Sequence, residues 1–237
     1  TGSYIKAEKL AERIRKDIFK KEQLTASCGI AENKMVAKMA CKKAKPNGVL
    51  VVEKDKIDQF LFLLKIQEIP GVGPKTAIVL EKFFKKRELK VEDVKKATRE
   101  ELIDLMGVAG DALYDKVRGI DETPIVVNGE IKSIGKEHTF AKDTRDSEEI
   151  FSVFYELILG IQKELQEQEL SFKIITVVCR FHGFETHTKS KTLKKVSKDG
   201  KVLKKESMRL LLRFLTENLK PVRLIGVRIQ VAGKSSK

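Results

Sequence analysis

A turn whose residue types could bind a ligand lies in the segment IPGVGPKT, residues 69–76. Two glycines stand one residue apart there, ahead of a lysine and a threonine. Glycine has no Cβ, so the backbone N–H groups of such a turn can approach a bulky anion closely. A helix that begins where the turn ends adds the positive end of its dipole. This order of residue types indicates a phosphate-binding turn. Its candidate contact residues are Gly71, Gly73, Lys75 and Thr76.

The spacing of the glycines decides which kind of phosphate site this is. A nucleotide-binding P-loop requires G-x-x-x-x-G-K-[ST] after a buried strand, whereas these glycines are closer together and follow a helical pattern. The segment instead resembles the helix-hairpin-helix of nucleic-acid enzymes, which holds the sugar-phosphate backbone without reading bases. A second glycine turn with Gly107 and Gly110 supports this, because such hairpins often occur in pairs. The alternative is a glycine-capped helix pair without a ligand.

The most specific stretch runs from Ser27 to Gly48 and reads SCGIAENKMVAKMACKKAKPNG. It looks like the palm signature of Y-family (DinB/UmuC-type) translesion DNA polymerases, S-x-G-I-x-x-N-K-x-x-A-K-x-A followed by K-P-[ND]-G. The resemblance continues in order along the chain. IPGVGPKT is similar to the family's thumb, KSIGKEHTF (132–140) to the entry of its little-finger domain, and VRLIGVRI (222–229) to that domain's last strand.

The resemblance implies roles for two lysines. In the family, the lysine of K-P-[ND]-G contacts the incoming deoxynucleotide triphosphate, and that position is Lys45 here. A lysine held by a stiff Pro-Asn-Gly turn can neutralise phosphate as a point charge. Lys38 is expected in the same basic neighbourhood. Without the surrounding signature, Lys45 would be read as an ordinary exposed turn lysine.

The charge pattern points to a polyanionic partner. The 237 residues carry a net charge of +14, and residues 171–237 contribute +13 of it, with 17 basic and 4 acidic side chains. Such an excess favours nucleic acid, although lysine-rich surfaces also occur for solubility alone. No apolar run is long enough to span a membrane, and we expect a cytoplasmic protein.

Basic side chains in the last domain are expected to contact DNA phosphates as a set. Arg223 and Arg228 stand at odd and even positions of one predicted strand, so they should face opposite sides unless Gly226 marks a bulge. Salt-dependent, sequence-tolerant binding should follow. The candidates are Lys132, Arg145, Lys173, Arg180, Lys189, Lys191, Arg223 and Arg228.

Periodicity predicts an α+β fold in three domains and a linker. Residues 1–55 should form a partial α/β palm layer, residues 56–120 an all-helical thumb with helix-hairpin-helix turns, and residues 121–131 a linker. Residues 132–237 should form a βαββαβ little finger whose two helices cover one face of an antiparallel sheet. Ser147 is the expected N-cap of its long amphipathic helix.

The sequence gives little indication of a metal site or of a nucleophilic cysteine. Cys179, His182 and His187 are close in sequence, but they lack a fourth ligand and do not have zinc-site spacing. Cys28 is expected within a buried strand, which does not suit a nucleophile. We therefore expect no metal site and no catalytic residue in this chain.

The resemblance also implies what is missing. Family polymerases join nucleotides with two magnesium ions held by carboxylates on an N-terminal strand and in an S-x-D-E-A segment, and neither is present. The parent would be a DNA polymerase acting on primer-template DNA, and this chain alone is expected to be inactive. Its incomplete palm, residues 1–55, should favour a homodimer. Two rivals are a natural non-catalytic DNA-binding or regulatory protein built from polymerase parts and a helix-hairpin-helix repair nuclease, which would need clustered acids.

Overall fold

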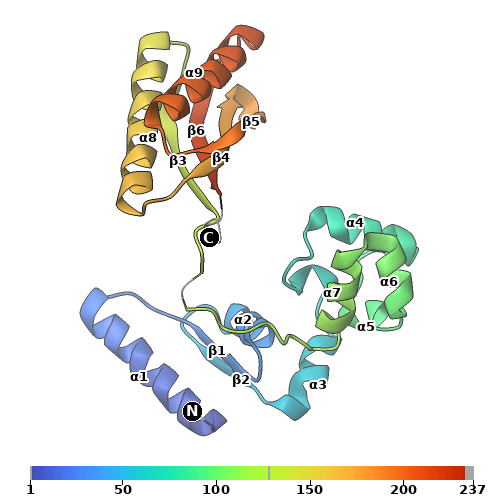
Figure 1. Cartoon of the computed structure of the whole chain (residues 1–237). Helices are drawn as coiled ribbons and strands as arrows, with labels where there is room; N and C mark the ends of the chain where they lie inside the picture. The colour runs from blue at the N-terminus through green and yellow to red at the C-terminus, as the bar shows by residue number, and fades with distance from the viewer. Residues whose placement is uncertain (1, 128, 233–237) are drawn as a thin grey trace. The chain divides into compact units, whose positions relative to one another are not determined.

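The computed structural model describes residues 2–127 and 129–232. The chain divides between residues 127 and 128 into two compact units. Each contains helices and strands (Figure 1), so the mixed α/β class is confirmed. Residue 1, residue 128 of the predicted linker and residues 233–237 of the predicted last domain lie outside the described residues.

The first unit opens with a small α/β layer. Two short apolar strands pair in parallel, with Cys28 opposite Val49 and Ala31 opposite Val52. Both α1 and α2 pack against this pair. Gly29 allows the close approach of α2, because a Cβ there would come within 2.0 Å of the Ala37 carbonyl oxygen. The elements are α1 (Tyr4–Glu22), β1 (Cys28–Ala31), α2 (Lys34–Lys43) and β2 (Val49–Val52).

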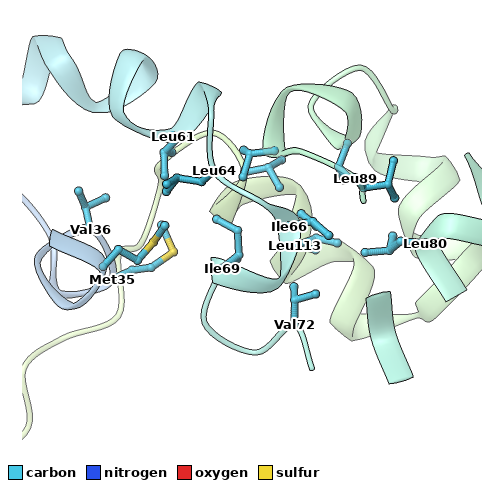
Figure 2. Packing of buried hydrophobic residues seen from close by; sticks show 14 of the residues in the cluster. Met35, Val36, Leu61, Leu64, Ile66, Ile69, Val72, Leu80, Leu89 and Leu113 are labelled. Carbon is cyan, nitrogen blue, oxygen red and sulfur yellow. The ribbon is translucent and has the colours of Figure 1, made fainter. Parts of the chain in front are cut away.

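The rest of the first unit is helical. Its helices are α3 (Ile57–Phe62), α4 (Pro74–Phe83), α5 (Val91–Val94), α6 (Arg99–Met106) and α7 (Val108–Lys116), with short 3-10 helices at Lys54–Lys56 and Ile66–Glu68. One continuous hydrophobic cluster joins this part to the α/β layer. Met35 and Val36 of α2 lie at one end of it and Leu80 and Leu89 at the other (Figure 2). The α/β layer and the helices therefore share a core.

The second unit is a four-stranded antiparallel sheet with two helices. Its elements are β3 (Ser133–Thr144), α8 (Ser147–Glu167), β4 (Phe172–Phe181), β5 (Thr186–Ser197), α9 (Gly200–Glu217) and β6 (Val222–Val231), with a short 3-10 helix at His182–Phe184. The strand order is β3-β6-β4-β5. Helices α8 and α9 lie on the same side of the sheet (Figure 1).

Alternation along the strands separates the two faces of this sheet. In β4, Ile175, Val177 and Cys179 are fully buried against the helices. The residues between them, with their partners in register, make up the opposite face, which we call the free face. Its central members are Gly135, Glu137, Thr139, Thr176, Val178, Arg180, Thr186, Thr188, Ser190, Leu224, Gly226 and Arg228.

One local prediction needs correction, and one open alternative, a bulge at Gly226, is resolved. The N-cap of α8 is Asp146, whose carboxylate accepts from the N–H groups of Glu148 and Glu149 at 2.9 and 3.3 Å, so the prediction of Ser147 was wrong by one residue. Gly226 pairs in regular register with Glu137 and is not a bulge. The register irregularity of β6 lies instead around Arg223, between the paired positions 222 and 224.

Within the described ranges, no helix is long and apolar enough to cross a membrane.

Candidate nucleic-acid interface

The glycine turn at residues 69–76 is anchored by its apolar residues. Ile69 and Val72 are buried in the shared core (Figure 2), while Gly71 and Gly73 between and after them are exposed. Gly71 adopts φ +98°, a conformation that side-chain-bearing residues rarely accept. Lys116 of α7 donates from Nζ to the Pro70 carbonyl oxygen at 2.9 Å. The turn is therefore fixed from both sides before any ligand arrives.

The exposed side of this turn offers backbone donors. Gly73 is the N-cap of α4 and Pro74 its first residue, so the helix begins directly at the turn. Among the described residues, no acceptor faces the N–H groups of Gly73, Lys75 or Thr76. Unpaired N–H groups at a helix N-terminus carry partial positive charge and bind phosphate oxygens well. The structure thus brings the predicted residues of this turn together around a set of unpaired N–H groups.

The second glycine turn joins α6 to α7. Gly107 adopts φ +60° and ψ −136°, which a residue with a Cβ would not readily accept. Gly110 has a different place from the one predicted. It is buried in the contact between the two helices, where a Cβ would lie 1.7 Å from the Leu102 carbonyl oxygen. Gly110 therefore permits close helix packing and is not available to a phosphate, whereas Gly107 and Val108 remain exposed.

Acidic side chains beside the second turn are neutralised from within the fold. The guanidinium of Arg99 bonds both Asp111 and Asp115 of α7. These hydrogen bonds, first to Asp111 and then to Asp115, hold the pKa of Arg99 above its ordinary value. Arg99 and Arg118 also stack on the Tyr114 ring at 4.4 and 3.4 Å from its centroid. Two carboxylates that would repel DNA are thereby paired.

The predicted nucleotide-binding lysines lie on the α/β layer. Lys38 is exposed on α2, and Lys45 is exposed on the turn that follows this helix. Arg15 of α1 holds the turn by donating from Nη2 to Asn47 Oδ1 at 2.6 Å, and from Nε to the Ala26 carbonyl oxygen at 2.7 Å. The position of Lys45 is thus set by a contact with α1 that the motif did not reveal.

Asn33 and Lys34 matched the palm signature without a predicted role, and the structure supplies one. Asn33 caps α2 by accepting from the Val36 N–H at 2.9 Å, and its Nδ2 donates to the Gly119 carbonyl oxygen at 2.7 Å. Lys34 Nζ donates to the Pro124 carbonyl oxygen at 3.1 Å. Asp121 accepts from the Met35 N–H at 3.2 Å. These bonds tie the chain that leaves α7 back to α2.

The contacts between α2 and the chain that follows α7 also lower the pKa of one carboxyl group, that of Asp121. A hydrogen bond from the Thr123 hydroxyl holds the pKa of Asp121 below its ordinary value, helped by the charge of Lys34 and by the Met35 N–H. The lowered pKa favours the ionised carboxylate of Asp121, which acts as an acceptor at the start of the predicted linker, residues 121–131. This part of the predicted linker is fastened to the first unit.

The free face of the sheet is rich in hydroxyls. Thr176 and Ser190 exchange a hydrogen bond at 2.8 Å, and Arg180 Nε donates to the Thr186 hydroxyl at 2.8 Å. Arg228 lies over Gly135, where a Cβ would come 3.3 Å from the arginine side chain. Beside one exposed acid, Glu137, and the apolar Val178 and Leu224, the face carries two arginines and several hydroxyls, which are groups suited to phosphate and sugar contacts.

Other predicted contact residues are placed elsewhere. Lys189 and Lys191 pair with Val177 and Ile175, so they project on the helix side of the sheet, and Lys189 bonds Glu217 of α9. Arg223 bonds Asp143 at 3.3 Å and lies over the Phe184 ring. The remaining candidates, Lys132, Arg145 and Lys173, are exposed. The predicted set is thus divided between two faces and does not form one patch.

The weak metal option has little support in the geometry. Cys179 is fully buried, and burial raises its pKa to about 12. His182 bonds Asp143 through Nδ1 at 2.7 Å. Across residues 2–127 and 129–232, no group of three His, Cys, Asp or Glu side chains is arranged to hold a metal ion.

Comparison with known proteins places the chain in a family. The model of the impB/mucB/samB family matches residues 2–42, and the model of that family's C-terminal domain matches residues 131–232. The chain belongs to this family. Two similar relatives are both called DNA polymerase IV. The relative from Methanoculleus marisnigri is 35% identical over 230 residues and that from Staphylococcus aureus (strain JH9) 36% over 229.

These matches cover 97% and 94% of this chain, but the chain spans only 62% of each relative's length. Solved structures agree with them. A Y-family DNA polymerase chimera of Dbh and Dpo4 matches with a TM-score of 0.72 at 28% identity, covering 97% of this chain and 65% of that one. DinB from Sulfolobus solfataricus matches with a TM-score of 0.54 at 27% identity, covering 97% and 66%. The resemblance to DinB-type Y-family polymerases is therefore confirmed.

Substitution of two glycines should separate packing from surface exposure. We expect Gly110→Ala to destabilise the first unit by more than about 2 kcal/mol, because its Cβ would overlap the Leu102 carbonyl oxygen. Gly73→Ala should cost less than about 1 kcal/mol, because nothing lies within 4 Å of its Cβ position. Urea unfolding followed by circular dichroism measures both. Equal losses would contradict the assignment of Gly110 to helix packing.

Proposed function

We propose that this chain is the DNA-holding part of a translesion DNA-directed DNA polymerase that acts in DNA damage tolerance and repair. The observation that carries the proposal is the glycine turn, whose unpaired N–H groups stand at the start of α4 on a turn braced by Lys116. Relatives named DNA polymerase IV and a ternary complex of Dbh DNA polymerase at 28% identity support DNA as the partner. The excess of 48 basic over 34 acidic residues supports a polyanion.

In this proposal, residues 56–120 act as a thumb with two helix-hairpin-helix turns. The first turn offers the N–H groups of Gly73, Lys75 and Thr76 to one phosphate, and the Lys75 side chain adds charge. The second offers only the first N–H groups of α7, because the Gly107 N–H already donates to the Ile103 carbonyl oxygen at 2.6 Å. Such contacts fix the register of the duplex and carry no sequence information.

The second unit would act as the little finger, with its free face against the duplex. Arg180 and Arg228 supply charge there, and the hydroxyls of Thr176, Thr186 and Ser190 supply short-range donors. Contacts of this kind bind many sequences equally, which suits a polymerase that must follow any template. Lys132, Arg145 and Lys173, which are exposed, would add to the electrostatic attraction.

Lys45 and Lys38 would attract the triphosphate of an incoming deoxynucleotide in the whole polymerase. Magnesium would serve that reaction by stabilising the attacking and leaving oxygens. The carboxylate segment that holds the ions in the family does not occur among these 237 residues. This chain by itself would therefore bind DNA without extending a primer, in a cytoplasmic setting.

We also propose that residues 1–55 associate with a second copy. The described β1–β2 sheet has two strands, so each strand leaves one edge unpaired. Unpaired edges favour association. A strictly monomeric mass in light scattering at high concentration would rule this out.

Neutralising the free face should weaken DNA binding and its salt dependence together. For Arg180→Gln/Arg228→Gln, we expect the slope of log affinity against log salt to become shallower by about 1.8, because two phosphate contacts are lost. The matched control, Lys9→Gln/Arg13→Gln, removes two exposed charges from α1 and should leave the slope unchanged. Fluorescence anisotropy with a labelled primer-template measures both. An unchanged slope in the free-face variant would remove this surface from the proposal.

Primer extension tests the division of labour. With magnesium and all four deoxynucleotides, the chain alone should give no extension above a mock purification, while it still shifts the labelled primer-template. Extension would mean that its own carboxylates hold the metal ions, and the assignment of a DNA-holding part would fail.

A further inference from the structure

The densest charge of the protein lies on the helix side of the second unit, away from the free face. Residues 191–213 contain nine basic and two acidic side chains, a net charge of +7 within a total of +14. They form the end of β5 and most of α9. The predicted contact residues Lys189 and Lys191 project on this same side. Apart from Lys194, which strand alternation places on the free face, this charge is therefore concentrated where the proposed free-face contact does not reach.

Within this region, four cations recur every fourth residue along α9. We call Lys201, Lys205, Arg209 and Arg213 the α9 stripe. A spacing of four places them on one helix face. All four are exposed. The opposite face of α9 is buried in the core through Leu203, Ser207, Leu210, Leu211 and Phe214. The stripe therefore faces solvent along most of the helix.

The α9 stripe is only partly balanced. Arg209 lies 3.6 Å from Glu206 and Arg213 lies 3.8 Å from Glu217, both loose contacts at the surface. Among the described residues, neither Lys201 nor Lys205 forms an ion pair. Like charges four residues apart destabilise a helix. The stripe therefore does not serve helix stability.

The neighbouring helix shows that basic charge is not general on this side of the sheet. Helix α8 carries five acidic residues and one lysine, whereas α9 carries five basic and two acidic residues. Both helices cover the same sheet face. A solubility role alone would not require charges of opposite sign on two adjacent helices. The contrast points to a linear anionic partner that lies along α9 and avoids α8.

We propose that the α9 stripe binds the phosphate backbone of a second DNA segment, in addition to the segment held by the free face. Cations four residues apart on a helix are about 6 Å apart along its axis, which suits successive phosphates of one strand. Residues 191–213 contain no aromatic side chain, so base stacking contributes nothing and duplex backbone fits better than single strands. Because the sheet separates the stripe from the free face, one unit can hold both segments.

The test counts short duplexes bound per chain, using the full chain at low salt and analytical ultracentrifugation with labelled DNA. The wild-type chain should bind two duplexes. The salt slope of the second step should be about −3.6, from four phosphate contacts. For Lys201→Gln/Lys205→Gln/Arg209→Gln, the second duplex should be lost or its slope reduced to about −0.9, while the first step changes less than about two-fold. Lys9→Gln/Lys16→Gln/Lys20→Gln on α1 is the control of equal charge and should still bind two.

The variants separate this inference from the proposed function. Arg180→Gln/Arg228→Gln should weaken the first step and keep the second, so failure of the free-face contact can be recognised independently. A wild-type chain that binds one duplex, or a triple α9 variant that still binds two with an unchanged slope, would overturn the inference. Displacement of the second duplex by polyglutamate of equal charge at equal concentration would also overturn it and assign the stripe to an acidic protein.

Discussion

The pair of hydrogen bonds made by the Asn33 side chain is the interaction on which the first unit depends. One side chain caps α2 through the Val36 N–H and also bonds the Gly119 carbonyl oxygen, where the chain returns from the helical part. Gly119 itself must lack a side chain, because it adopts φ +76° and a Cβ would lie 2.3 Å from Ile57. Because Gly119 is bonded to Asn33 and packs against Ile57, the first and last residues of the helical segment lie close together beside α2. The glycine turns are positioned relative to α2 through this joint and the shared core.

Two kinds of contact surface result from this construction. The first unit presents backbone N–H groups, whose positions are fixed by Lys116, Ile69 and Val72. The second unit presents side chains on a rigid sheet, with arginines among hydroxyls. In the proposed function neither arrangement would favour one base over another, because both would contact phosphate and sugar. Affinity should arise mainly from electrostatics, and register from the fixed backbone donors.

Much of this could be predicted from the sequence where local rules decide. Apolar runs predicted β2, β4 and β6, and the glycines predicted the turn before α4. Ser147 and Asp146 show the limit of such rules, since both residue types cap helices well and only the fold selects between them. Gly110 shows another limit, because a glycine that permits helix packing and one that meets a ligand look the same in sequence.

Long-range contacts account for the rest. Lys189 carries the same charge as Arg228, but strand register and Glu217 place it on the other side of the sheet. Asn33 matched a motif, yet its bond to Gly119 spans 86 residues and has no local signature. Position on a strand could be read from periodicity, whereas the partner of a charged side chain depended on the assembled fold.

The most direct test is the affinity of the full chain for two duplexes of equal length and unrelated sequence, measured by anisotropy across a series of salt concentrations. The account predicts affinities within about three-fold of each other and a log–log slope of about −4 or steeper, because phosphate contacts dominate. A strong preference for one sequence, or a nearly flat slope, would contradict the claim that this chain holds DNA by its backbone.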